Sequence, residues 1–388
     1  MSQLHWIEAG ERRAARWVSE NGSHPPEEVR LASEDPALRL SPAEAWALVA
    51  SGVGILWRGD YHAGRELLTA MGKQDRIQPA PSATASGTAH DAFFQHRATQ
   101  ARRALALGRF LVAFDHGFVL PLRRAPDLRL ACAEAYGDAV APFAVSLREV
   151  LGLVGAHEWR KKGVEIPALR GRIHPYYGVY SPVRGEYIDL VARAPIPPSL
   201  SAPNSVGAGG SLAFDIGTGT GVLAAVLAQR GVSRVVATDQ DARAVACARD
   251  NASRLGLTRR IDVLQCDMFP DGRAGLVVCN PPWVPATPTS AVEHGVYDPD
   301  SRMLRGFLSG LAAHLAPGGE GWLVLSDFAE HLGLRTRPEL LGWIAAGGLR
   351  VIDRLDTRPT HAKASDATDP LHQARAVEVT SLWRLGVG

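Results

Sequence analysis

The stretch Ser211-Leu-Ala-Phe-Asp-Ile-Gly-Thr-Gly-Thr-Gly221 decides the fold of this chain. Its first half is apolar and predicts a β-strand, and the segment VLAAVLAQRG that follows predicts a helix. Alternating glycines let the backbone approach a ligand closely, and the following helix offers free amides and the positive end of its dipole. A dinucleotide fingerprint would need a glycine where Val222 stands, which disfavours an NAD-dependent oxidoreductase.

Further short apolar runs alternate with helical segments along the second half of the chain. The predicted strands span residues 211–217, 234–239, 261–267, 275–280, 319–326, 350–356 and 376–385. Strands that alternate with helices predict a parallel sheet covered by helices on both faces, a Rossmann-like, doubly wound α/β fold. Ligands of such sheets bind at the carboxyl ends of the strands.

Acidic residues stand at three of these strand ends. Asp215 lies in the first strand, Asp239 ends the second and Asp267 ends the third. A single aspartate at such a place commonly caps a turn or helix, but three in register favour a nucleoside ligand. By its position, Asp239 is expected to accept hydrogen bonds from the ribose hydroxyls. Asp267 or the Met268 backbone is expected to contact the adenine. The predicted cofactor-binding residues are Asp215, Gly217, Thr218, Gly219, Gly221, Asp239, Asp267 and Met268.

The fourth predicted strand ends in the tetrapeptide Asn280-Pro281-Pro282-Trp283. Tandem prolines fix a stiff turn, so that the Asn280 side-chain oxygen and the Pro281 carbonyl can point at one place. Two acceptors there would grip an sp2 amine, and Trp283 offers a π-face for a planar group. The plainer alternative is a structural turn with an aromatic anchor. We take these four residues as the candidate catalytic group.

Together these motifs resemble those of class I S-adenosylmethionine-dependent methyltransferases, in the subset whose fourth strand ends in Asn-Pro-Pro-aromatic. That subset includes the HemK-like glutamine methyltransferases of release factors and ribosomal proteins and the amino-methyltransferases of adenine, cytosine and guanine. The resemblance covers residues 176–388. It implies S-adenosyl-L-methionine as the cofactor, a seven-stranded sheet with an antiparallel last strand, and N-methylation of a planar nitrogen. Positioning and hydrogen bonding would suffice for this reaction without a strong base.

The substrate stays open between a nucleobase amine, a protein glutamine amide and a small-molecule amine. The segment from Tyr180 to Glu186 loosely resembles the Pro-Arg-Pro-Glu-Thr-Glu segment of HemK-like enzymes, with Gly185 replacing the second proline. Residues 285–303 form a polar, irregular stretch, expected to cover the substrate like a lid. The candidate substrate contacts are Tyr180, Arg184, His294 and Tyr297.

With 388 residues, the chain is long enough for two domains. We expect a mixed, mostly helical accessory domain for substrate recognition at 1–175 and the catalytic domain at 176–388. An accessory domain of this size favours a macromolecular substrate, RNA or protein, over a small molecule. The alternative from another functional class is a non-catalytic scaffold, which would bind the cofactor without transferring methyl groups. Loops or linkers are predicted at 79–90, 195–211 and 358–376.

The amino-acid composition limits which classes of protein this chain can belong to. Apolar residues make up 46% of the chain and charged residues 21%, as in globular proteins, and the net charge of +2 does not by itself indicate nucleic-acid binding. The arginine-rich segments 91–130 and 157–174 are weaker candidates for RNA contact. The 4 cysteines form no CxxC pair, which disfavours a metal site. The charged start lacks a signal-peptide stretch, so we expect a cytoplasmic protein with no membrane association.

Overall fold

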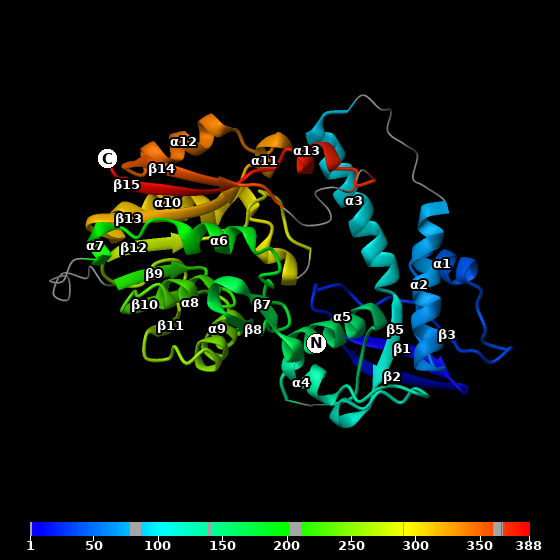
Figure 1. Ribbon diagram of the computed structural model, residues 1–388. Coiled ribbons are helices and arrows are strands. Elements are labelled where there is room, and N and C mark those ends of the chain that lie inside the picture. Colours follow the sequence, from blue (N-terminus) through cyan, green and yellow to red (C-terminus); the bar gives the residue numbers. More distant parts are fainter. Residues whose placement is uncertain are drawn as a thin grey trace. The chain divides into compact units, whose positions relative to one another are not determined.

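The computed structural model describes residues 2–77, 87–138, 141–201, 212–289, 291–359, 366 and 368–388 (Figure 1). It divides into two compact units, Met1–Gly87 with Phe94–Glu158 and Thr88–Phe93 with Trp159–Gly388. The predicted loops at 79–90, 195–211 and 358–376 lie partly outside the described residues. Within the described ranges, no helix is long and apolar enough to cross a membrane.

The N-terminal unit contains a six-stranded sheet in the order β1-β2-β6-β5-β4-β3. Its strands are β1 (Gln3–Glu8), β2 (Glu11–Trp17), β3 (Val29–Ala32), β4 (Gly54–Trp57), β5 (Phe110–Phe114) and β6 (Phe143–Ser146). Its helices are α1 (Pro42–Ser51), α2 (Tyr61–Ile77), α3 (Ala89–Leu107), η1 (His116–Phe118), α4 (Arg129–Tyr136) and α5 (Leu147–Lys162). The start of α3 and the end of α5 are assigned to the second unit. The unit thus has six strands besides its helices, and the sequence analysis did not predict this sheet.

Local signals explain where the first helices of this unit begin. Ser41 and Glu44 form a reciprocal capping box at the start of α1, and Pro42 occupies its first turn. At the start of α2, the buried Asp60 carboxylate accepts hydrogen bonds from the backbone N–H groups of His62 (2.9 Å) and Ala63 (3.2 Å). These caps satisfy amides that a helix start leaves unpaired.

The C-terminal unit contains a seven-stranded sheet in the order β11-β10-β9-β12-β13-β15-β14 (Figure 1). The strands are β9 (Leu212–Ile216), β10 (Arg234–Asp239), β11 (Ile261–Gln265), β12 (Ala274–Cys279), β13 (Leu315–Ser326), β14 (Leu349–Thr357) and β15 (Thr380–Val387). The first five are parallel, and β15 is antiparallel to both β13 and β14. The prediction of a seven-stranded, Rossmann-like sheet with a final antiparallel hairpin is confirmed.

Helices cover both faces of this sheet. They are α6 (Glu186–Arg193), α7 (Pro198–Ser201), α8 (Val222–Gln229), α9 (Ala242–Arg254), α10 (Arg302–His314), α11 (Phe328–His331), α12 (Arg337–Ala346) and α13 (His372–Ala376), with the short elements β7 (Val164–Ile166), η2 (Pro167–Leu169), β8 (Gly171–Ile173), η4 (Ala291–Gly295) and η5 (Pro299–Ser301). One apolar cluster joins α6, α8 and α9 to the sheet, and a second joins α10 and α12 to it. Neighbouring strand residues alternate between the clusters: Ala213 belongs to the first and Phe214 to the second.

The strand order reverses between β9 and β12. From β9 the chain proceeds to β10 and β11 on one side, and then crosses to β12 on the other. In open α/β sheets, the crevice at such a reversal, at the carboxyl ends of the strands, is where ligands bind. The glycine loop after β9 and Asn280 after β12 both follow strands at this point.

Candidate functional site

The glycine loop after β9 is held by Asp215 from inside the domain. The Asp215 carboxylate is 1% exposed and accepts hydrogen bonds from the Thr218 hydroxyl (2.6 Å) and the Ala224 backbone N–H (3.0 Å). Burial raises the pKa of Asp215 to about 6. Its side chain therefore fixes the turn between β9 and α8 and ties the loop to the first turn of the helix.

The backbone conformation favours glycine at all three glycine positions of the loop. Gly217, Gly219 and Gly221 have φ of 68°, 55° and 81°, in the left-handed region that other residues rarely adopt. Gly221 also packs against α9, where an added Cβ would lie 3.2 Å from the Ala248 Cα. Of the three, only Gly219 would have nothing within 4 Å of an added Cβ, so the loop backbone is open to close approach at that residue.

Asp239 lies against this loop. One oxygen of its carboxylate accepts the Gly219 backbone N–H (2.9 Å), and the other accepts the Asp241 backbone N–H (3.0 Å). Burial raises the pKa of this carboxyl, too. A carboxylate has about four lone-pair sites, so Asp239 keeps acceptor capacity beyond its backbone contacts. The structure therefore brings together two residues that the sequence separates.

The turn after β11 lies next to Asp239. The Cys266 backbone N–H donates to the Asp239 carbonyl (3.0 Å), and the Met268 carbonyl accepts from the Thr238 hydroxyl (2.6 Å). Asp267 is exposed and forms an ion pair with Arg302 (2.8 Å). Asp239, Asp267 and Met268 thus belong to one neighbourhood, although the Met268 carbonyl and one Asp267 oxygen already have partners within the chain.

The Asn280 turn begins one residue after β12. The Trp283 indole N–H donates to the Asn280 Oδ1 at 2.8 Å. The buried Arg335 donates from Nη1 to the Trp283 carbonyl (3.4 Å) and from Nη2 to the Ser326 carbonyl (3.2 Å). The turn is therefore held both within itself and from the end of β13.

The candidate substrate residues Tyr180 and Arg184 reach this turn. The Arg184 guanidinium lies 5.7 Å from the centroid of the Trp283 ring, and its Nη1 lies 3.4 Å from Glu378 Oε1. Tyr180 packs against the loop after the turn, since a Cβ on Gly295 would lie 2.6 Å from the Tyr180 Cβ. Burial raises the pKa of the Tyr180 hydroxyl.

The other two candidates lie in the loop itself. His294 is exposed in η4, whereas Tyr297 is half-buried and packs with Trp283 on an apolar cluster that includes Phe93. Asp298 ties the loop to α10 by accepting the Met303 backbone N–H (3.0 Å). The structure gives Tyr297 a place beside the turn, and it places His294 at the surface.

The sequence analysis missed a buried polar group next to the turn. Glu378 is 2% exposed and accepts a hydrogen bond from the Ser326 hydroxyl (2.7 Å). Ser326, Arg335 and Glu378 come from three separate segments, so no local motif joins them. The one available signal was a glutamate within the apolar run Ala376-Val-Glu-Val-Thr380.

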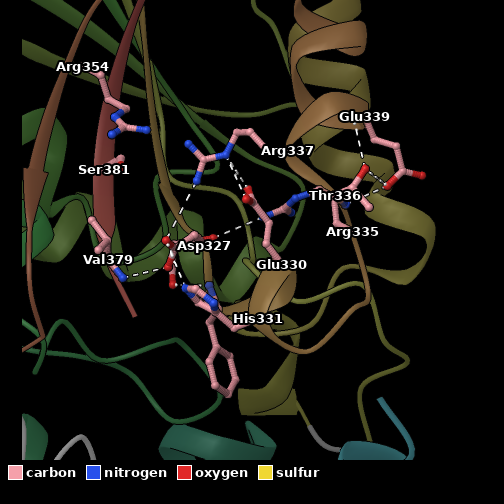
Figure 2. Close-up of polar contacts among 12 residues, drawn as sticks. Asp327, Glu330, His331, Arg335, Thr336, Arg337, Glu339, Arg354, Val379 and Ser381 are labelled. Carbon is pink, nitrogen blue, oxygen red and sulfur yellow. Dashed lines mark hydrogen bonds and ion pairs between the residues drawn. The ribbon is translucent and has the colours of Figure 1, made fainter. Parts of the chain in front are cut away.

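A second polar cluster fixes the chain next to Glu378 (Figure 2). Asp327, at the end of β13, accepts the Val379 backbone N–H (2.7 Å), and its other oxygen lies 3.3 Å from the His331 ring. Glu330 pairs with Arg337 at 2.9 Å. These contacts join α11 and α12 to the start of β15, and so hold Glu378 in place.

Among the described residues, the buried side-chain polar atoms without a hydrogen-bond partner lie mostly in the C-terminal unit. Among the described residues, six of the seven such atoms belong to Ser181, Glu186, Arg335, His372, Glu378 and Thr380. These residues lie in the segments that carry Arg184, Arg335 and Glu378. Buried polar groups are normally paired, so these atoms set the segments that carry Arg184, Arg335 and Glu378 apart from the rest of the described chain.

The two arginine-rich segments are largely engaged within their own units. Arg124 forms hydrogen bonds of 2.6 and 2.7 Å to Asp60, Arg129 pairs with Asp127 (2.6 Å), and Arg172 donates to the Lys162 carbonyl (2.8 Å). Their contact with RNA stays a prediction.

A known family model covers both the glycine loop and the Asn280 turn. Residues 209–335 match the family model of the methyltransferase small domain. A release factor glutamine methyltransferase of Cereibacter sphaeroides is 34% identical over 121 residues, which are 27% of this chain and 43% of that protein. A ribosomal protein L11 methyltransferase of Sorangium cellulosum is 28% identical over 209 residues, 50% of this chain and 60% of that protein.

A solved ribosomal protein L11 methylase of Lactobacillus delbrueckii is 17% identical with a TM-score of 0.32, covering 45% of this chain and 69% of that one. The matches to the two curated relatives span less than two thirds of either one's length. The family and sequence matches confirm the predicted resemblance to class I methyltransferases of the HemK-like type, and with it S-adenosylmethionine as the cofactor of this domain.

Proposed function

We propose that the C-terminal unit is an S-adenosylmethionine-dependent N-methyltransferase that acts on a planar sp2 nitrogen. The observation that supports this most is the position of Asn280. It follows β12, whose neighbour β9 leads into the glycine loop that contacts Asp239. An acceptor turn and a cofactor loop thus follow adjacent strands where the strand order reverses.

The residues present fit the cofactor. Asp239 has acceptor capacity for the ribose hydroxyls, and the turn at Asp267 and Met268 lies beside it for the adenine. An added Cβ at Gly219 would meet nothing within 4 Å, so the methionine part could approach the loop there. When bound, S-adenosylmethionine supplies an electrophilic methyl group on a sulfonium.

The chain's part in the reaction is to hold the attacking nitrogen. The Asn280 Oδ1 and the Pro281 carbonyl would accept the two N–H groups of an amide or aryl amine. These acceptors favour the form in which the nitrogen lone pair is localised, and they become more favourable as the N–H groups gain acidity. The nitrogen would gain the methyl group as the methyl carbon–sulfur bond breaks to leave S-adenosylhomocysteine, and it would lose one proton to solvent, so no strong base is needed. Orientation and preorganised acceptors then supply the rate enhancement.

We propose a protein amide as the substrate, with the N-terminal unit as its recognition domain. Support comes from the relatives, which are named for release factor glutamine and ribosomal protein L11 methylation. A nucleobase amine in RNA and a small-molecule amine are the alternatives that the same acceptor pair would accommodate.

The test is methyl transfer from radiolabelled S-adenosylmethionine into an extract of cells that lack this protein. Aliquots are then treated with protease, treated with nuclease or passed through a size filter. We expect label that protease releases and nuclease leaves intact. Label that nuclease releases would show that the substrate is RNA and not protein. Label that passes the size filter would show that it is a small molecule. Absence of label despite tight S-adenosylhomocysteine binding would favour a scaffold without catalysis.

A further inference from the structure

We infer that Trp283 is a positioning residue that fixes the Asn280 side-chain amide through its indole N–H. The fourth position of the turn would then require tryptophan, and not simply an aromatic ring. This inference deepens the proposed N-methyltransferase function and rests on it for the consequence in catalysis.

The chemistry of the two groups settles which Asn280 atom faces the indole. An indole N–H can only donate, so the atom 2.8 Å away must be the carbonyl oxygen and not the amide nitrogen. The amide turned by 180° would place its own donors against the indole donor. An asparagine amide otherwise interchanges these two orientations readily, because its last torsion is roughly two-fold. The indole thus removes one of the two orientations.

This contact leaves the proposed acceptor intact. A carbonyl oxygen has two lone pairs, and the indole uses one of them. The second stays available for a substrate N–H, and the Oδ1 that offers it is held at a fixed place. Without the indole, the turned amide would present a donor to the substrate nitrogen where an acceptor is required.

Three further contacts hold Trp283 itself. Arg335 donates to its carbonyl (3.4 Å), the Arg184 guanidinium lies over its ring at 5.7 Å, and its ring packs against the cluster that includes Val284 and Phe328. The guanidinium engages a face of the ring that the sequence analysis had offered to a planar substrate. The N–H edge of Trp283, rather than that face, is the part that serves Asn280.

Other aromatic residues cannot replace this contact. Phenylalanine has no donor, and the tyrosine hydroxyl lies at the far end of its ring, whereas the indole nitrogen lies close to the Cβ. The variants Trp283→Phe and Trp283→Tyr should therefore both lose the hydrogen bond to Asn280 while they retain most of the packing.

The hydrogen bond can be measured without any substrate, by NMR of the full chain labelled with 15N at the tryptophan indoles. The chain has 9 tryptophans, and the Trp283 signal is the one that Trp283→Phe removes. In Asn280→Ala that indole proton should move toward the position of an unbonded indole, whereas in Asn280→Asp, which keeps an acceptor, it should stay hydrogen-bonded. An unchanged Trp283 signal in Asn280→Ala would overturn the inference. Trp283→Tyr should remove the same signal, which assigns it a second time, and the 8 other indole signals should stay in place in whichever variant is used for the assignment.

The catalytic consequence is measured with the extract fraction that the wild type labels. Trp283→Phe and Trp283→Tyr should each lower kcat roughly tenfold or more, because the acceptor is misplaced, with the S-adenosylhomocysteine Kd unchanged. The matched control is Trp322→Phe, which removes another indole hydrogen bond, to Glu320 Oε2 at 3.1 Å, and should leave kcat near the wild-type value. Normal kcat in Trp283→Phe would contradict the inference. A wild type that labels nothing would contradict the proposed function instead, and the NMR result would still decide the contact.

Discussion

Replacing Asp239 by alanine should remove most of the cofactor affinity. The Asp239 carboxylate follows β10 and accepts the backbone N–H groups of Gly219 and Asp241 at 2.9 and 3.0 Å. In the proposed complex it also accepts the two ribose hydroxyls. The substitution therefore removes both ribose contacts and releases the amide that holds the glycine loop against β10.

The magnitude follows from the hydrogen bonds lost. A hydrogen bond to a charged group contributes about 1.5–3 kcal/mol, so the two ribose contacts together contribute at least about 3 kcal/mol. Each 1.4 kcal/mol is about a tenfold change in Kd, which gives a loss of affinity of ~100-fold or more.

Isothermal titration calorimetry with S-adenosylhomocysteine measures this loss. Asp262→Ala is the matched control, because Asp262 is an aspartate on the neighbouring strand β11 that pairs with the exposed Arg234 (2.7 Å) away from the loop. It should bind like the wild type. If folded Asp239→Ala bound S-adenosylhomocysteine within threefold of the wild type, the assignment of Asp239 to the ribose would be refuted.

Three further predictions concern the loop and the core. The folded state holds the Asp215 proton more tightly than the unfolded chain, since burial raises the pKa of Asp215 from its usual 3.8 to about 6. This group's contribution to the free energy of unfolding should therefore fall, by up to about 3 kcal/mol, as the pH rises from about 4 to above 6. Urea denaturation across this range should show that fall as a difference between the wild type and Asp215→Asn; a pH-independent difference would contradict it. Gly217→Ala should cost about 1–2 kcal/mol of loop strain, because φ is 68° and its Cβ would collide with Met303 Cε, and calorimetry should show weaker S-adenosylhomocysteine binding. Phe307→Ala, at a fully buried site on α10, should lower the free energy of unfolding by about 3–5 kcal/mol in urea, and a loss under 1 kcal/mol would refute its place in the core.

Much of the catalytic fold could be predicted because each of its strands has a recognisable pattern in the local sequence. The runs 234–239 and 261–267 are bounded by turn residues and differ from the observed β10 and β11 by two residues at most. The start of β13 was placed at 319 rather than Leu315, because Pro317 and the two glycines after it conceal the extension. In the N-terminal unit, β2 has the sequence ERRAARW, whose charged residues show no strand pattern. The pairing of β2 with β1 and β6 depends on tertiary contacts, which the local sequence does not indicate.

The site could be predicted only as far as its motifs are contiguous. The glycine loop, Asp239 and the Asn280 turn are predicted from the sequence as the candidate site, and the structure brings the loop into contact with Asp239. The contact of the Trp283 indole with Asn280 was missed, because the sequence analysis considered only the face of the Trp283 ring and not the N–H donor at its edge. The association of Arg184 with Glu378 joins residues 194 positions apart, and only folding brings them together.

The most direct test of the central claim is the rate of methyl transfer by Asn280→Ala, measured on the labelled fraction at saturating S-adenosylmethionine. If Asn280 holds the attacking nitrogen, kcat should fall about 10²–10³-fold, as for the loss of one preorganised hydrogen-bonding group in other enzymes. Binding of S-adenosylhomocysteine should be unchanged, because the cofactor residues lie on β9, β10 and the turn after β11. Near-normal turnover with intact cofactor binding would contradict the account.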